Sequence, residues 1–197
     1  MNNILCLYKN NGSVVEPNGK DIMVSDFNYA QIALAGNHAD KTDNGNIMLV
    51  SQCDIDIANK FKWYLNSNGY PATYGTHDGD IKFSRPVPFH LILYANSVPS
   101  GYVIDHINRD RLDNRRENLR MCTPLQNSYN KSKPKNSHNT YKGVTKVGTK
   151  NPTYTASITK EGVKREMKRI PTERQAAEMY DLMAEELFGE YAAKNFK

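Results

Sequence analysis

The pattern of apolar and polar positions is clearest between residues 102 and 131. Apolar-rich segments at 102–107 and 118–122 predict two short strands, joined by a polar loop with seven formal charges and two asparagines. Thr123 follows as a helix N-cap, with Pro124 at the first helical position and Gln126 completing a capping box. A helix should therefore begin at 124 and end near 131, which makes this region a strand–strand–helix unit.

The C-terminal sixty residues show a second regular pattern. Segments 141–147, 153–159 and 163–170 have strand character and are separated by turns that contain glycine, asparagine or proline. Thr172 and Gln175 form a second capping box, and apolar residues at helical spacing follow as far as Gly189, which predicts a helix over 173–188. We expect a three-stranded antiparallel sheet with one helix.

The N-terminal half has a less regular pattern of short elements. We expect helices near 26–34, 54–63 and 89–94, a buried strand at 47–50, and strands at 70–74 and 80–83. Residues 131–139 are polar, basic and interrupted by proline, as is typical of a linker. The predicted fold class is α+β, with an N-terminal α+β region (1–85), a strand–strand–helix unit (86–132), a basic linker (133–138) and a sheet-and-helix domain (139–197).

Positive charge is concentrated in one part of the chain. Residues 101–170 contain 16 Lys and Arg against 6 Asp and Glu, whereas the remainder contains 10 against 15. A basic region of this kind is expected of a surface that binds the phosphates of a nucleic acid. The alternative is a solvated basic face with no partner.

The cysteines and the hydropathy pattern limit the environment of the protein. The 3 cysteines are far apart, form no Cys-x-x-Cys pair and suggest no disulfide framework, which favours a reducing compartment. No window approaches the roughly 20 apolar residues of a membrane span. We therefore expect a soluble, cytoplasmic protein, in the host cytoplasm if the chain is encoded by a phage.

The strand–strand–helix unit also contains groups suited to metal binding and proton transfer. Asp105 is a hard oxygen ligand of the kind that Mg²⁺ accepts, and His106 can exchange a proton near neutral pH. Asn127 supplies an amide oxygen in the first helical turn, where the helix N-terminus favours a bound anion. Neighbouring side chains of a regular strand point to opposite faces, so Asp105 and His106 need a local distortion to approach one phosphate.

These residues resemble the HNH (ββα-metal) endonuclease family, in the variant whose last motif residue is Asn. The resemblance implies that Asp105 and Asn127 hold one divalent cation, Mg²⁺ or Mn²⁺, that His106 activates water, and that the central Asn118 pins the loop by hydrogen bonds. The structural zinc of some relatives is not expected, because its four cysteines are missing. His90 and Asn130 are auxiliary candidates, and for His90 a supporting role in the core or behind the active site is at least as well favoured.

The C-terminal domain resembles AP2 DNA-binding domains in the order and spacing of Tyr141-Lys142-Gly143-Val144, 154–158, 176–181 and 188–196. This chain departs from plant members by Lys142 and Tyr154, where Arg and Trp are usual. The resemblance implies that the sheet enters the major groove. Lys164 and Lys168 should share one face, and Arg165 and Arg169 the other. The candidate DNA-binding residues of the whole chain are Arg115, Arg116, Arg120, Lys131, Lys133, Lys142, Lys146, Tyr154, Lys164, Arg165, Lys168 and Arg169.

The leading hypothesis is a metal-dependent DNA endonuclease of the homing or phage type. It would act on double-stranded DNA as a monomer, and its single metal site would favour nicking. One alternative is a DNA-binding regulator whose nuclease unit no longer cuts. Another is a nuclease that acts on RNA or on DNA without sequence preference.

Overall fold

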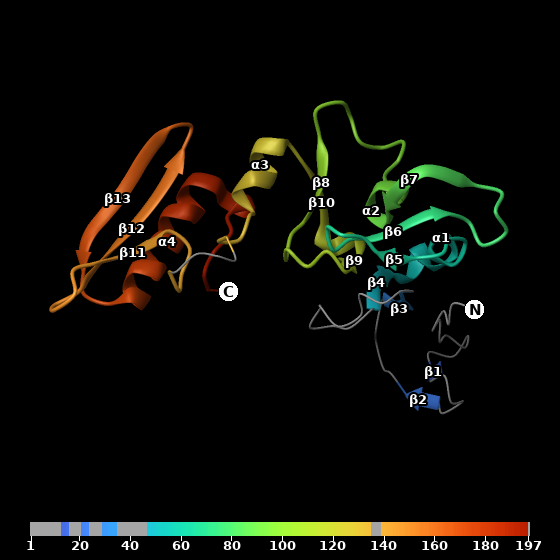
Figure 1. Cartoon of the computed structure of the whole chain (residues 1–197), viewed down its shortest axis with the longest axis horizontal. Helices are drawn as coiled ribbons and strands as arrows, with labels where there is room; N and C mark the ends of the chain where they lie inside the picture. The colour runs from blue at the N-terminus through green and yellow to red at the C-terminus, as the bar shows by residue number, and fades with distance from the viewer. Residues whose placement is uncertain (1–12, 16–20, 24–28, 35–46, 135–138, 197) are drawn as a thin grey trace. The chain divides into compact units, whose positions relative to one another are not determined.

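The computed structural model describes residues 13–15, 21–23, 29–34, 47–134 and 139–196, which form mixed α+β units (Figure 1). The chain divides between Met121 and Cys122 into two compact units. This division lies inside the segment 86–132, for which the sequence predicts a single unit. The α+β fold class is confirmed. No helix in the described part of the chain is long and apolar enough to cross a membrane.

The first unit contains a three-stranded sheet built from distant parts of the chain. Strand β3 (Tyr29–Ala33) pairs antiparallel with β4 (Ile47–Ser51), and β9 (Asp113–Asn114) pairs parallel with β4. Strand β9 lies in the polar loop of the strand–strand–helix unit, so this loop completes the N-terminal sheet. Its Leu112 joins the same buried core as Ile32, Val50 and Phe89. The N-terminal region and the loop therefore fold as one body.

A second sheet and two short helices complete the N-terminal part. Residues Gln52–Asp54 form the 3-10 helix η2, followed by α1 (Ile55–Asn59). Strands β5 (Tyr64–Leu65), β6 (Pro71–Gly75) and β7 (Lys82–Pro88) pair in that order, and α2 (Phe89–Leu93) follows β7. Strands β1 (Ser13–Val15) and β2 (Asp21–Met23) form a separate antiparallel pair.

Two of the predicted N-terminal helices are wrong in type or length. The helix predicted near 26–34 is strand β3 over its described residues, where Ala30, Ile32 and Leu34 are buried in alternation against the core. Pairing with β4 therefore outweighs the weak helical pattern. The helix predicted at 54–63 ends at Asn59, because Phe61 pairs with Thr76 and buried Trp63 turns back to donate its indole N–H to the Ala58 carbonyl at 2.7 Å.

The strand–strand–helix elements form where they are predicted. Strands β8 (Val103–His106) and β10 (Leu119–Cys122) pair with each other, and the 3-10 helix η3 (Arg116–Asn118) precedes β10. Helix α3 (Pro124–Tyr129) begins at the predicted capping box, in which Thr123 accepts from the Gln126 amide and the Gln126 side chain accepts from the Thr123 amide.

The second unit contains α3 and a sheet covered by one helix. Strands β11 (Val144–Val147), β12 (Thr153–Lys160) and β13 (Val163–Ile170) form an antiparallel meander. Helix α4 (Glu173–Phe188) packs on it through Ala176, Ala177, Tyr180 and Ala184, and the 3-10 helix η4 (Gly189–Tyr191) follows. Gly143 precedes β11 with φ +71°, and a Cβ there would lie 2.0 Å from the Tyr180 ring, so only glycine fits.

Candidate active site

The position of His106 depends on the core of the first unit. Phe89, at the start of α2, is fully buried, and its ring contacts Trp63 edge-on with 5.1 Å between centroids. This anchor fixes the neighbouring residue, His90, which is also buried. The His90 ring then meets the His106 ring at the end of β8 with centroids 5.0 Å apart and planes at 86°.

Two further side chains enclose the His106 imidazole. Tyr70 lies with its ring centroid 5.9 Å from that of His106 and 5.2 Å from that of His90. The guanidinium of Arg111 sits over the Tyr70 ring at 4.7 Å. Asn114 of β9 places its Oδ1 3.2 Å from His106 Nε2. The catalytic candidate is thus held by groups from α2, the β5–β6 turn and β9.

The Asn114 contact indicates which ring nitrogen of His106 carries the proton. The Nδ2 group of Asn114 donates to the Arg111 carbonyl at 3.1 Å, which directs its Oδ1 toward His106. An amide oxygen accepts only, so His106 Nε2 carries the hydrogen and Nδ1 is the basic nitrogen of the neutral ring.

Burial keeps both histidines uncharged near neutral pH. Burial lowers the pKa of His106 and outweighs the raising effects of the Asn114 hydrogen bond and of the nearby carboxylates. Burial and the charge of His106 lower the pKa of His90 to about 3. The Nδ1 atom of His90 has no hydrogen-bond partner among the described residues. His106 is therefore a neutral imidazole that can accept a proton.

Asp105 is held by an arginine on the neighbouring strand. Arg120 of β10 donates from Nε at 3.0 Å and from Nη2 at 2.9 Å, both to Asp105 Oδ2. Both side chains are nearly buried, with exposures of 8% for Asp105 and 11% for Arg120. The sequence predicts that Arg120 binds DNA, and the structure places it against the carboxylate of the predicted metal ligand. Asp105 and His106 thus contact different neighbours, as expected for adjacent strand residues.

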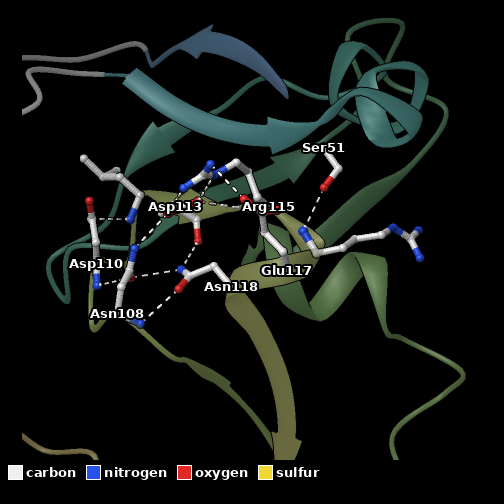
Figure 2. Close-up of polar contacts among 9 residues, drawn as sticks. Ser51, Asn108, Asp110, Asp113, Arg115, Glu117 and Asn118 are labelled. Atoms are coloured by element: carbon white, nitrogen blue, oxygen red, sulfur yellow. Dashed lines mark hydrogen bonds and ion pairs between the residues drawn. The ribbon is translucent and has the colours of Figure 1, made fainter. Parts of the chain in front are cut away.

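Asn118 ties the polar loop together (Figure 2). Its Oδ1 accepts from the Asn108 amide at 2.9 Å, and its Nδ2 donates to Asn108 Oδ1 at 2.9 Å and to the Asp113 carbonyl at 2.7 Å. Asn108 also donates to Asp113 Oδ2 at 2.8 Å. These bonds close the loop directly after His106.

Two other arginines predicted to bind DNA also form ion pairs inside the first unit. Arg115 binds Asp113 through Nε at 2.8 Å and Nη2 at 2.7 Å (Figure 2). Burial raises the pKa of Asp113, but the hydrogen bonds and charge of Arg115 outweigh it and hold that pKa below its usual value. The Arg116 side chain donates to both carboxylate oxygens of the fully buried Asp54. The backbone N–H of Arg116 donates to Ser51 Oγ at 2.8 Å.

The remaining nuclease-site candidates lie in the second unit. Asn127 is half-buried on α3, and Asn130 is buried at the C-cap of that helix. Their assignment to the metal site stays a prediction. Within the described ranges, no group of three or more His, Cys, Asp or Glu side chains could hold a metal ion. A carboxylate with an amide oxygen nevertheless suits Mg²⁺, which is commonly bound by one or two carboxylates together with water and phosphate oxygens.

The predicted DNA-binding cations of the second unit have different surroundings. Lys164 and Lys168 both pair with Glu166 at 2.6 Å, so they share one face of β13 as predicted. Arg165 pairs instead with Glu186 of α4, whereas Arg169 has φ +59° near the register shift of β13. Tyr154 packs against the α4 core. Lys131 and Lys146 are exposed, and Lys133 and Lys142 donate to backbone carbonyls.

Several residues that shape the site are not singled out by the sequence. Its local pattern places Asn114 in a turn, makes Asp54 an ordinary acid at a helix N-terminus, and gives no reason to select Tyr70 or Arg111. Their roles depend on the β4–β9 pairing and on the β5–β6 turn, which join segments about sixty and forty residues apart. No local pattern signals such contacts.

Comparison with known proteins identifies the family. Residues 88–129 match the family model described as HNH endonuclease. A mimivirus protein, "Uncharacterized HNH endonuclease L560" of Acanthamoeba polyphaga mimivirus, is 44% identical over 151 residues, which cover 77% of this chain and 75% of the relative. Protein 3.8 of Escherichia phage T7 is 40% identical over 47 residues, which cover 24% of this chain and 39% of that protein. No solved structure was found to match. With β8, β10 and α3 inside the matched residues and a relative this similar over most of its length, the chain belongs to the HNH endonuclease family.

Proposed function

We propose that this protein is a divalent-metal-dependent DNA endonuclease that nicks double-stranded DNA and leaves a 5′-phosphate and a 3′-hydroxyl. The observation that carries the proposal is the buried, neutral His106 next to the Arg120-held carboxylate of Asp105. Asp105 and Asn127 would hold the cation. A bound Mg²⁺ or Mn²⁺ supplies Lewis-acid stabilisation of the scissile phosphate and of the departing 3′ oxygen.

The chain's own groups provide the proton transfer. His106 accepts a proton from the attacking water at Nδ1, while its Nε2–H is oriented by Asn114. His90 and Tyr70 exclude water from the imidazole face and so keep the base uncharged. Asn118 holds the loop that follows the base. Arg120 orients Asp105 and balances its charge until the cation is bound.

We further propose that the second unit recognises DNA in the manner of AP2 domains. On β12, Thr155, Ser157 and Thr159 alternate with the buried Ala156 and Ile158, so they face away from α4. Lys164 lies opposite Thr159 and shares this open face with Lys168. Hydroxyl groups flanked by lysines suit contacts to phosphates and base edges in the major groove.

The test is plasmid cleavage with Mg²⁺ or Mn²⁺ and with EDTA. We expect nicked circles from the wild type, no product in EDTA, and losses of at least about a hundredfold for the His106→Ala, Asp105→Ala and Asn127→Ala variants. Each variant should still bind DNA in EDTA. The control is His77→Ala, because His77 is exposed in a distant turn. Binding without cleavage by the wild type would instead support the regulator, and full activity of the Asp105 or Asn127 variant would reject that ligand.

A further inference from the structure

The short helix α3 is attached to the C-terminal sheet domain by contacts within the second unit. It has only six residues, too few to hold its conformation or position by its own hydrogen bonds. Its place must therefore come from tertiary contacts. The proposed metal ligand Asn127 lies on this helix, so whatever positions α3 also positions that ligand.

An aromatic stack forms the first attachment. The rings of Tyr129, the last residue of α3, and Phe188, the last residue of α4, lie 4.0 Å apart with planes at 14°. Phe188 packs in turn against the buried core between α4 and the sheet. The C-terminal end of α3 is thereby fixed to the core of the domain.

Hydrogen bonds to backbone carbonyls at and just after the C-terminal end of α3 form the second attachment. Lys142 Nζ donates to the Lys131 carbonyl at 2.6 Å and to the Tyr129 carbonyl at 3.3 Å, and the Ala193 amide also donates to the Tyr129 carbonyl at 3.4 Å. The last carbonyls of a helix lack partners within it and carry partial negative charge, so an ammonium group is well placed there.

Lys142 is itself held firmly by the domain. The backbone N–H of Lys142 donates to Asn195 Oδ1 at 2.7 Å, and the backbone carbonyl of Lys142 accepts from Asn195 Nδ2 at 3.1 Å. The backbone N–H of Asn195 donates to Oδ1 of the buried Asp181 on α4 at 2.7 Å. A chain of bonds therefore runs from α4 through Asn195 and Lys142 to α3.

We infer that the C-terminal domain positions the active-site helix, with Tyr129, Phe188 and Lys142 acting as positioning residues for Asn127. The inference rests on the proposed role of Asn127 as a metal ligand. The domain that we propose reads DNA would then also be part of the catalytic machinery. Lys142, for which the AP2 resemblance implies a DNA contact, acts on the metal site through α3.

The experiment uses the full chain and separates this role from DNA binding. Tyr129→Ala and Lys142→Met are compared with wild type for the single-turnover rate at saturating DNA, the Mg²⁺ concentration at half-maximal rate, and DNA affinity in EDTA. Tyr129→Phe retains the stacked ring. Lys150→Met removes one charge from an exposed lysine in the loop after β11 and serves as the matched control for Lys142→Met.

We expect Tyr129→Ala and Lys142→Met to lower the maximal rate by about tenfold or more, because small displacements of a catalytic group are costly. They should also raise the Mg²⁺ requirement, while DNA affinity in EDTA stays within about twofold of that of the control variant. Tyr129→Phe should match the wild type. A pure phosphate contact by Lys142 would instead weaken DNA binding and leave the rate at saturation unchanged, which would overturn its positioning role.

Asn127→Ala, measured in parallel, distinguishes the positioning inference from the ligand assignment on which it rests. If it is inactive while Tyr129→Ala and Lys142→Met keep wild-type rates and Mg²⁺ dependence, the positioning inference is wrong and the ligand assignment stands. If Asn127→Ala cleaves normally, the ligand assignment itself fails. Circular dichroism identifies a variant that does not fold, and the Lys142→Met result then decides the matter without Tyr129→Ala.

Discussion

Basic side chains form ion pairs in both units, but the surroundings of these pairs differ. In the first unit, Asp54, Asp105 and Asp113 have side chains no more than 8% exposed, and each binds an arginine by at least two hydrogen bonds. In the second unit, the lysines that pair with Glu166 are more than half exposed, as is Glu186, the partner of Arg165. Basic residues thus pair with buried carboxylates in the first unit and with exposed or partly exposed carboxylates in the second.

Burial explains the difference in use. A buried carboxylate that loses its partner leaves an uncompensated charge, so such pairs set geometry and resist change. An exposed pair contributes little and can be exchanged for a phosphate contact. The arginines paired with Asp54, Asp105 and Asp113 therefore stabilise the first unit, whereas the exposed lysines of β13 are those that we propose contact a nucleic acid.

The largest expected effect tests this contrast through stability. Arg116→Ala should lower the free energy of unfolding of the first unit by about 3 kcal/mol, because the fully buried Asp54 then loses its partner. Arg165→Ala should cost less than about 1 kcal/mol, because its pair with Glu186 is exposed. Urea unfolding followed by circular dichroism measures both, and fluorescence of Trp63, the single tryptophan, reports the first unit. Equal losses would contradict the contrast.

A second effect follows from the buried histidines. The folded state keeps His90 uncharged down to a pKa of about 3, whereas the unfolded chain binds a proton below about 6.5. The free energy of unfolding should therefore fall as pH falls from about 6.5 toward 3. This loss should reach about 2 kcal/mol at pH 5. His90→Phe should reduce this loss, as judged by Trp63 fluorescence in urea at pH 7 and pH 5. His77 is exposed, so the control variant His77→Asn should show the same loss of stability as the wild type between pH 7 and pH 5.

The smallest effect tests the exposed lysines. Hydrogen bonds and charge from Lys164 and Lys168 lower the pKa of Glu166 to about 2, so it is ionised at neutral pH. Glu166→Gln should free both lysines and tighten DNA binding by no more than about tenfold, because the pairs are exposed. It should also steepen the dependence of log affinity on log salt by roughly 0.9 for each additional phosphate that the lysines neutralise. Glu178→Gln, which loses the same charge from an α4 pair with Arg174, is the control. Equal effects would mean that β13 does not bind DNA.

Local patterns were sufficient for the regular elements of both motifs. The capping residues Thr123, Gln126 and Thr172 predicted the starts of α3 and α4, and β8, β10 and β12 formed within the segments predicted from their apolar content and strand character. Capping and strand propensity depend on residues a few positions apart, so a short stretch of sequence contains the information that they need. The same reasoning failed for β3, whose strand conformation depends on pairing with β4.

The sequence by itself determined the class of chemistry, because carboxylate, imidazole and amide groups occur at the spacing of a known nuclease motif. Only the tertiary structure decided how these groups are supported. It paired Asp105 with Arg120, set His106 against Asn114 and His90, and attached the end of α3 to Phe188 and Lys142. Burial and partner choice depend on segments distant in sequence that come together only when the core forms, so the charge of a residue alone does not tell whether it builds a site or binds DNA.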